Sequence, residues 1–503
     1  MEPYDTGCGV GPFAASRTSF EALVTELEGP VTAQWTHDRL EELIETSGRE
    51  VLRCLLQDHL DLRAVREEAD LATRLRAGGC PAGRNRMEHG HSRTLATVVG
   101  PVTVRRCALR APGEPNIYPA DAALSLPAVR HSHGLRKQAV LEAVRSSYDT
   151  THAAISRRCG PVAGKRQLEG LVVAAAADID AFYASAIPEP VTASTLLVLS
   201  ADSKGIVMRP DSLREPTRRT AAHAAPVFRT RLASGEKPNR KRMATLAVVY
   251  DADPAPRRPH DVICVGGART GDRQPRPGPR ARGTWLTGSV TKTAGDVITD
   301  AFTRAQARDP THTRVWVVLV DGARHQLDLI QAEAARRRAV VHIVLDFVHV
   351  LERLWTAAWC FHTHPDPAVE DWVAVRAVAI LSGHANAVAE AITTQADAAG
   401  LAPDRREGAD VTARYLRNNL EFLHYDTALA AGWPIATGVI ESACRHLVQD
   451  RLDIGGARWG LPGAEAVLTL RALIDNGSFD DYWKYHLAQE HRRVHPNDHQ
   501  LAA

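Results

Sequence analysis

The sequence predicts an α/β fold, because apolar runs typical of buried strands alternate with stretches of helical spacing. Three of these runs lack a polar alternation, which indicates strands covered on both faces. Each run leads into an acidic residue, and the runs with their acids occupy residues 196–202, 315–321 and 343–346. Helical spacing at residues 326–338 indicates a helix between two of the strands, so we expect parallel strands in the core.

Length and composition indicate a globular protein of several domains. The chain has 503 residues, of which 44% are hydrophobic. This length suits roughly two to four domains with their own cores. Lys and Arg number 61 against 59 Asp and Glu, which gives a net charge of +2. The overall charge therefore does not indicate a nucleic-acid partner, and any such contact must come from local clusters of cations.

Cysteine usage and hydropathy predict a cytoplasmic protein. Eight cysteines are scattered through the chain without a C-x-x-C pair, which indicates reduced thiols. The N-terminus lacks the basic and apolar segments of a secretory signal. Because no apolar run approaches the roughly 20 residues that span a bilayer, we expect no membrane partner.

Residues 1–134 are expected to form a loosely ordered N-terminus followed by an α+β region. Gly and Pro are spread through residues 1–36 with little periodicity. Residues 37–76 instead show apolar residues at helical spacing between charges, which predicts one or two amphipathic helices. Two strand patterns, at residues 95–99 and 102–104, flank a Gly-Pro turn as in a hairpin.

Four side chains that bind metals lie in and around this hairpin: Cys80, His89, His91 and Cys107. Such residues are ligands of zinc in many proteins. Their spacing lacks the close ligand pairs of a zinc ribbon, so the sequence leaves zinc binding open.

Residues 135–190 are expected to form a helix-turn-helix region. Three helices are predicted at residues 135–146, 150–158 and 165–183, with a Cys-Gly-Pro turn before the third. This order is typical of a helix-turn-helix whose last helix contacts DNA. The third helix begins with donors suited to phosphates and base edges, namely Lys165, Arg166 and Gln167. A plain helical bundle fits the same spacing.

Residues 191–485 contain three acids that suit a metal site. Asp202 and Asp321 are expected at strand ends, where a rigid element holds a carboxylate that still reaches solvent. Glu441 lies in the first turns of a helix that Thr437 is expected to cap. Nine cations lie in residues 214–242, before the strand pattern at residues 243–250, and seven Arg lie in residues 257–282. Both clusters suit contact with a DNA backbone, although solvated loops have the same composition.

Five segments resemble the bacterial insertion-sequence transposases of the Kra type. They are ADSKGIVMRPDSLRE, KPNRKRMATLAVVYD, VVLVDGARHQ, VLDFVHVLERLWTAAW and GVIESACRHLVQDRLDIGGARWGLPGAEAVLTLRAL. The resemblance spans about residues 37 to 495. It implies a DDE transposase, with a ribonuclease-H-like catalytic core built on a mixed sheet.

The resemblance also implies the chemistry of the site. Asp202, Asp321 and Glu441 would be the catalytic acids and would hold two Mg²⁺ or Mn²⁺ ions, with Asp202 shared by both. Such ions, about 3.5 to 4 Å apart, stabilise the attacking and leaving oxygens of a phosphodiester. We expect cleavage at the ends of the element and strand transfer into target DNA, by a homo-oligomer assembled on DNA.

Several other residues are candidates for DNA contact, and two for a structural role. The DNA candidates in this region are Lys204, Arg209, Arg240, Lys241, Arg242, Arg445, His446 and Arg458. Any of them could form an ion pair instead, as Arg445 could with Glu441 one helical turn away. Asp346 and His349 resemble the Asp/Cys-x-x-His signature of DDE proteins and are expected to brace the core.

The remaining segments complete the expected organisation. Helical spacing between the second and third acids predicts a helical insertion at about residues 350–430. Residues 486–503 are rich in His without a ligand pattern and are expected to be a polar tail. Two other functions fit the sequence: a transposase-derived DNA-binding protein without catalysis, and a metal-dependent nuclease that does not join DNA.

Overall fold

The computed structural model describes residues 11–78, 84–186, 194–223, 240–265 and 274–496. The chain forms two compact units. Unit 1 contains residues 1–182 and 479–503, and unit 2 contains residues 183–478. The sequence placed the boundary at residue 190 and did not predict that the C-terminal segment belongs to unit 1.

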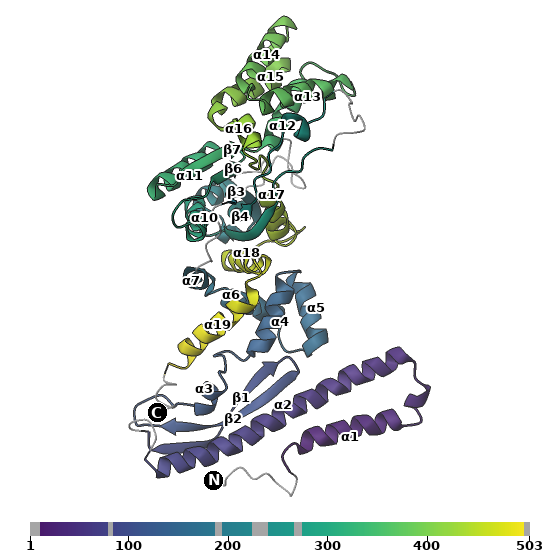
Figure 1. Ribbon diagram of the computed structural model, residues 1–503. Coiled ribbons are helices and arrows are strands. Elements are labelled where there is room, and N and C mark those ends of the chain that lie inside the picture. The colour runs from purple at the N-terminus through teal and green to yellow at the C-terminus, as the bar shows by residue number, and fades with distance from the viewer. Residues whose placement is uncertain (1–10, 79–83, 187–193, 224–239, 266–273, 497–503) are drawn as a thin grey trace. The chain divides into compact units, whose positions relative to one another are not determined.

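Unit 1 begins with a helical pair and a β-hairpin (Figure 1). Helix α1 (Ala14–Glu28) precedes a short turn η1 (Thr32–Gln34) and the long helix α2 (His37–Arg76). Strands β1 (Arg86–Thr97) and β2 (Gly100–Arg110) form the antiparallel hairpin that the sequence predicts.

The expectation of a loosely ordered N-terminus was wrong for residues 11–36. Contacts between helices supply the order that the sequence pattern does not show. The Ser16 amide donates to the Asp58 carboxylate of α2 at 2.9 Å. The buried Thr32 hydroxyl donates to the Glu26 carbonyl at 2.7 Å.

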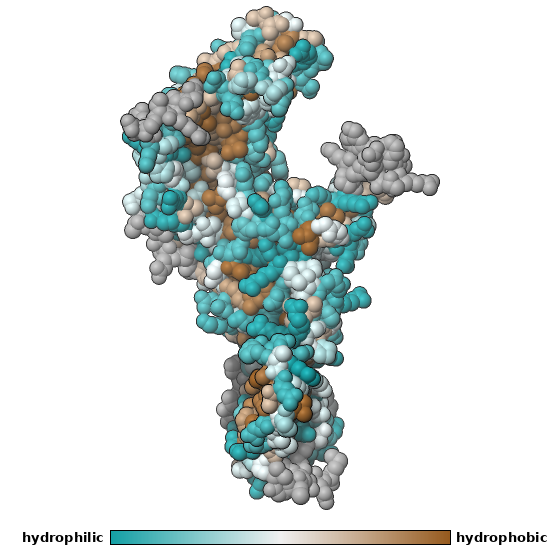
Figure 2. Space-filling view, turned by 90° about the vertical axis from the view of Figure 1, so that its right-hand side faces the viewer, coloured by the Kyte–Doolittle hydropathy of each residue, from teal (hydrophilic) through white to brown (hydrophobic). Residues whose placement is uncertain are grey.

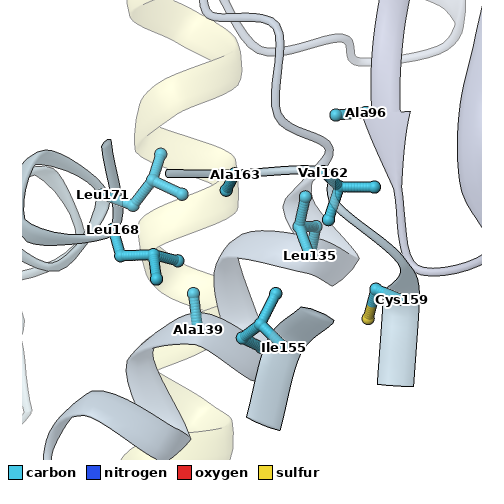
Figure 3. Close-up of a cluster of buried hydrophobic side chains, with 9 residues drawn as sticks. All are labelled: Ala96, Leu135, Ala139, Ile155, Cys159, Val162, Ala163, Leu168 and Leu171. Carbon is cyan, nitrogen blue, oxygen red and sulfur yellow. The ribbon is translucent and has the colours of Figure 1, made fainter. Parts of the chain in front are cut away.

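The helical part of unit 1 has a core of its own (Figure 3). After α3 (Pro119–Ala123), helices α4 (His133–Ala143), α5 (Tyr148–Cys159) and α6 (Lys165–Ala175) pack around a cluster of buried side chains. The cluster consists of Ala96, Leu135, Ala139, Ile155, Cys159, Val162, Ala163, Leu168 and Leu171. These three helices lie where a helix-turn-helix was predicted.

The third predicted helix divides into two, α6 and α7 (Ile179–Ser185). The break brings the buried Asp178 against the C-terminal helix, where Arg493 donates to both of its oxygens at 2.6 and 2.9 Å. Helix α19 (Phe479–Val494) therefore corrects the predicted polar tail. His486 in this helix is 1% exposed.

Unit 2 is built on a mixed five-stranded sheet in the order β5-β4-β3-β6-β7. The strands are β3 (Leu196–Val207), β4 (Lys241–Ala252), β5 (Ala281–Ser289), β6 (Trp316–Val320) and β7 (Val341–Leu345). Strand β4 is antiparallel to β3 and β5, whereas β3, β6 and β7 are parallel. The predicted α/β class is confirmed, and so are the parallel strands. Residues 196–201 of β3 and all of β6 are buried as predicted, whereas β7 at the sheet edge is only partly buried.

Helices lie in the described parts of the connections between these strands. They are η2 (Pro210–Ser212), α8 (Glu215–His223), α9 (Pro259–Val262), α10 (Ala294–Arg308) and α11 (Arg324–Arg337). The described residues between β7 and Glu441 are helical in large part, as predicted. This segment contains α12 (Phe347–Ala358), α13 (Ala368–Leu381), α14 (Ala385–Ala398), α15 (Pro403–Asn418), η3 (Leu420–Phe422), α16 (Tyr425–Ala430) and the start of α17 (Gly438–Ala443). The π-helical turn η4 (Cys444–Gln449) and α18 (Leu461–Asp475) complete the unit.

The surface view shows mainly hydrophilic residues, with hydrophobic residues in separate patches (Figure 2). Within the described residues, no helix has the length and apolar character needed to cross a membrane.

Candidate functional site

Asp202 lies within a strand and not at its end, which corrects the prediction. Strand β3 pairs with β6 only from Leu197 to Ser200, but its pairing with β4 continues to Val207. Ser200 is the last residue of β3 that pairs with β6, and Asp202 lies two residues beyond it. At Asp202, β3 is therefore paired with β4 alone. Its carboxylate accepts hydrogen bonds from the Ser203 amide at 2.6 Å and the Cys444 thiol at 3.2 Å.

Asp321 directly follows β6, the neighbour of β3 in the sheet. The next residue is Gly322, whose φ of 93° lies in the region that favours glycine. A Cβ at this position would also lie 3.0 Å from the Leu345 side chain. The chain can therefore turn sharply after Asp321 and begin α11. Gln326 in the first turn of α11 donates to the Ala201 carbonyl at 2.6 Å, which ties this helix to β3 beside Asp202.

Glu441 lies on the short helix α17, as the sequence predicts, but the preceding Thr437 makes no side-chain cap. The Thr437 hydroxyl instead contacts two carboxylates, Glu441 at 2.9 Å and Asp346 at 2.7 Å. The helix continues into the π-helical turn η4, which begins at Cys444. Such turns are frequent at functional sites because they change the direction in which side chains point.

The three acids line one pocket of about 360 Å³. The other lining residues are Ala201, Lys204, Val348, His349, Glu352, Thr437, Ile440, Cys444, Arg445 and Gln449. Among the described residues, none of the three carboxylates has an ion-pair partner within 4.0 Å. The pocket therefore brings together three carboxylates whose hydrogen-bond donors are neutral groups.

The acids surround the pocket and do not form a tight cluster. Among the described residues, one group of three potential metal ligands has all its ligand atoms within 4.8 Å of one another. This group lies in unit 1 and does not include the three acids of the pocket. The ligand atoms of Asp202, Asp321 and Glu441 are therefore more widely separated. Wider spacing suits acids that flank a pair of ions, because the ions themselves are about 3.5 to 4 Å apart.

Asp346 supports the pocket from a fully buried position. It begins α12, where its side chain accepts a hydrogen bond from the Val348 amide at 3.0 Å. Burial raises the pKa of the Asp346 carboxyl, and its hydrogen bond from Thr437 opposes that shift. Thr437 has one hydroxyl proton for its two carboxyl neighbours, so it donates to one of them at a time. His349 lines the pocket, and its Nδ1 lies 3.8 Å from Asp346.

Cys444 was not among the residues singled out from the sequence. Burial and the neighbouring Asp202 raise the pKa of its thiol well above the ordinary value, so the thiol is the donor in their contact. The sequence analysis also missed two further roles. Thr437 links two carboxylates, and Glu352 is a fourth acid of the pocket. Only their proximity to Asp346 and Glu441 in the sequence could have indicated them.

Of the cations proposed for DNA contact, Lys204 and Arg445 line the pocket. Among the described residues, Arg445 does not form the ion pair with Glu441 that was considered as an alternative. His446 lies 3.0 Å from Asp475. Arg209 and Arg458 are exposed near the end of β3, where the Arg209 amide donates to the Trp459 carbonyl.

The cations before β4 have different surroundings. Arg240 is exposed, and Lys241 pairs with Asp453 at 3.2 Å. Arg242 donates to the carbonyls of Val290 and Ser212, so its guanidinium has a structural role. Parts of both cation-rich segments, residues 224–239 and 266–273, lie outside the described residues.

The candidate DNA-reading residues of unit 1 are exposed at the start of α6. Lys165 pairs with Asp149. The Gln167 side chain accepts a hydrogen bond from the Gly164 amide at 3.0 Å and thereby caps α6. Arg166 is exposed beside them, so this helix start presents cations to solvent.

The four zinc candidates are not all together. His89 and Cys107 approach each other, and both lie near Glu68, which the sequence did not suggest. His91 instead contacts Glu88 at 3.4 Å and the Tyr118 ring. Cys80 lies outside the described residues.

Comparison with models of protein families finds no family that matches the chain, and no curated protein matches it either.

Proposed function

We propose that this protein is a DNA transposase that binds the ends of an insertion element and catalyses metal-dependent cleavage and strand transfer. One observation supports the proposal most directly. Three carboxylates from β3, from the end of β6 and from α17 line one pocket, although 119 and 120 residues separate them along the chain. They match the three acids that the resemblance to Kra-type transposases assigns to catalysis.

The sheet supports a ribonuclease-H-like core. It is mixed, with β4 antiparallel to its two neighbours, and the first two acids lie on β3 and directly after the neighbouring parallel strand β6. The third acid lies on a helix that follows a long helical insertion, as expected for a DDE transposase with an insertion between its second and third acids.

The donor set of the pocket suits hard divalent cations. Asp202, Asp321 and Glu441 provide carboxylate oxygens, which Mg²⁺ and Mn²⁺ prefer, and no described cation neutralises them at ion-pair distance. When bound, two such ions would activate the attacking oxygen and stabilise the departing 3′ oxygen.

Other residues of the pocket have supporting roles in this proposal. Thr437 fixes Glu441 by a hydrogen bond, and the buried Asp346 in turn fixes Thr437. Oriented ligands of this kind bind metal more tightly, since less side-chain motion is lost on binding. Lys204 and Arg445 line the same pocket, and in this proposal they contact the phosphates of DNA.

A strand-transfer assay tests the proposal. The substrate is a DNA duplex with the terminal repeat, identified as an inverted repeat flanking the gene, together with supercoiled target DNA and Mg²⁺. We expect nicked ends and joined products with the wild-type protein. Asp202→Asn, Asp321→Asn and Glu441→Gln should each reduce both products by orders of magnitude. The matched control is Asp328→Asn, because Asp328 is an acid on α11 that pairs with Arg324 and does not line the pocket.

The same assay distinguishes the alternatives. Cleavage without joined products would favour a metal-dependent nuclease. Binding to the terminal repeat without either product would favour a DNA-binding protein that lacks catalysis. Undiminished strand transfer by Asp202→Asn would exclude the proposed site.

A further inference from the structure

A second group of metal-binding side chains lies in unit 1, away from the acid pocket along the chain. Glu68 of α2, His89 of β1 and Cys107 of β2 each offer a ligand atom, and these atoms all lie within 4.8 Å of one another. His89 Nδ1 is 2.9 Å from Glu68 Oε1 and 4.0 Å from Cys107 Sγ. Each ligand comes from a different element of secondary structure.

A β-bulge brings His89 opposite Cys107. The register of the hairpin shifts between Glu88 and His91, which pair with Ala108 and Arg106. Two residues of β1, His89 and Gly90, therefore face the single residue Cys107 of β2. Gly90 has a φ of 80°, which glycine adopts without strain. Bulges of this type change the direction of a side chain and are common beside functional sites.

The electrostatic surroundings of Cys107 favour a cation. Its side chain is 1% exposed, and a ligand oxygen of Glu68 lies within 4.8 Å of its sulfur. A buried thiol beside a carboxylate lies in a negative potential. A divalent cation would reverse that potential and stabilise the thiolate, with release of the thiol proton to solvent.

We propose that Glu68, His89 and Cys107 form a zinc site that joins helix α2 to the β-hairpin. Sulfur, imidazole nitrogen and carboxylate oxygen together match the ligands of Zn²⁺, whereas Mg²⁺ takes oxygen ligands. Bond lengths of about 2.0 to 2.3 Å in a tetrahedron place ligand atoms about 3.3 to 3.8 Å apart. The distances of 2.9 and 4.0 Å differ from that range by a few tenths of an ångström. His89 is 37% exposed, so solvent can supply the fourth ligand.

This site would stabilise the fold of unit 1, because zinc binds the folded arrangement of three separate elements and not the unfolded chain. The inference does not depend on the proposed transposase activity. The bulge also accounts for the position of His91 away from Cys107, because it directs His89 and not His91 toward that thiol.

Cobalt binding to the metal-stripped full-length protein tests the site, because a thiolate ligand gives Co²⁺ an intense charge-transfer absorption. We expect this absorption at one Co²⁺ per chain and its loss when Zn²⁺ is added. Loss of an outer-shell partner weakens metal binding roughly 10- to 100-fold. His89→Ala and Glu68→Gln remove proposed direct ligands, so each should weaken Zn²⁺ binding by more than that. Cys107→Ser should abolish the thiolate absorption.

Two controls separate this site from other groups. His91→Ala removes a neighbouring imidazole that does not belong to the cluster, and Cys444→Ser removes the thiol of the acid pocket. Both should retain the absorption and the Zn²⁺ affinity of the wild type. Zn²⁺ should also raise the unfolding temperature of the wild type but not that of His89→Ala. Loss of the absorption in Cys444→Ser, or equal Zn²⁺ affinity in wild type and His89→Ala, would overturn the proposal.

Discussion

Two aspartates on neighbouring strands of the same sheet have opposite surroundings. Asp251 on β4 is 8% exposed and accepts hydrogen bonds from Arg308 at 3.0 Å and Arg314 at 2.5 Å. Asp202 on β3 accepts hydrogen bonds from the Ser203 amide and the Cys444 thiol, which are neutral. The first carboxylate has its charge balanced by two arginines, and the second has no described cation at ion-pair distance.

The difference separates a structural carboxylate from one that can bind a cation. A buried charge without a partner is costly, so the protein compensates Asp251 with arginines. At the pocket, three acids remain uncompensated within reach of solvent, and a bound cation would supply the missing charge. Arginines thus compensate Asp251, whereas the three acids at the site of the proposed chemistry have no described cation at ion-pair distance.

The largest expected effect is on stability at Asp251. Asp251→Ala leaves Arg308 and Arg314 buried without their partner, which should lower the free energy of unfolding by about 3 to 5 kcal/mol. Asp202→Ala removes no ion pair, so in metal-free buffer it should change that free energy by about 0.5 kcal/mol or less. Chemical unfolding of both variants measures the contrast. Equal losses would show that Asp202 is also a structural acid.

The next effect concerns the hydroxyl that links Asp346 to Glu441. Thr437→Val keeps the shape of the side chain but removes both carboxyl contacts, so Mn²⁺ affinity at the pocket should fall roughly 10- to 100-fold. Thr469→Val is the matched control, because the Thr469 hydroxyl donates to carbonyls of its own helix. Calorimetric titration measures the Mn²⁺ affinity of both variants. Wild-type affinity in both would contradict the supporting role of Thr437.

A third carboxylate, Asp178 in unit 1, extends the comparison to pH. It contacts Arg493 and also Nδ1 of the buried His486 at 2.6 Å, while Nε2 of His486 faces an Arg136 nitrogen at 3.2 Å. Nε2 also lies 3.4 Å from a Glu490 oxygen, and a neutral imidazole can donate to Asp178 while it accepts from Arg136. Burial accordingly lowers the pKa of His486.

The sign of the pH effect follows from that shift. Unfolded His486 has a pKa of about 6.5, so below that pH the unfolded chain binds a proton that the folded chain resists. Stability should therefore be complete above about pH 6.5 and decrease as the pH falls below it. Unfolding of the wild type and His486→Gln between about pH 7.5 and 5.5 measures this, and the variant should show the flatter dependence. Identical pH profiles would refute the role of His486.

The smallest expected effect is on DNA binding, and it distinguishes cations that line the pocket from cations that stabilise the fold. Arg445→Ala and Lys204→Ala should each weaken DNA binding and reduce its salt slope by about one unit, with little change in stability. Arg242→Ala should instead lower stability, because Arg242 donates to two backbone carbonyls. A gel-shift titration over salt concentration makes the comparison. An unchanged slope in both pocket variants would exclude them from phosphate contact.

The sequence predicts four of the five strands of unit 2, because a run such as residues 196–199 is apolar on both faces and leads toward an acid. It does not predict β5, which has few apolar residues. It could not predict that β3 continues past Asp202, since this depends on β4 pairing beyond the end of β6. Nor could it predict the burial of His486, because the partners of that residue lie about 300 residues away. Roles that depend on tertiary contacts, such as those of Cys444 and Glu68, have no local pattern.

Diffraction from crystals soaked in Mn²⁺, recorded at the manganese absorption edge, tests the proposed metal centre. We predict two anomalous peaks about 3.5 to 4 Å apart in the pocket, both within bonding distance of oxygens from Asp202, Asp321 or Glu441. A pocket without manganese at a saturating concentration of the ion, or manganese bound only at other acids, would contradict the proposal that these three carboxylates form the metal centre of a transposase.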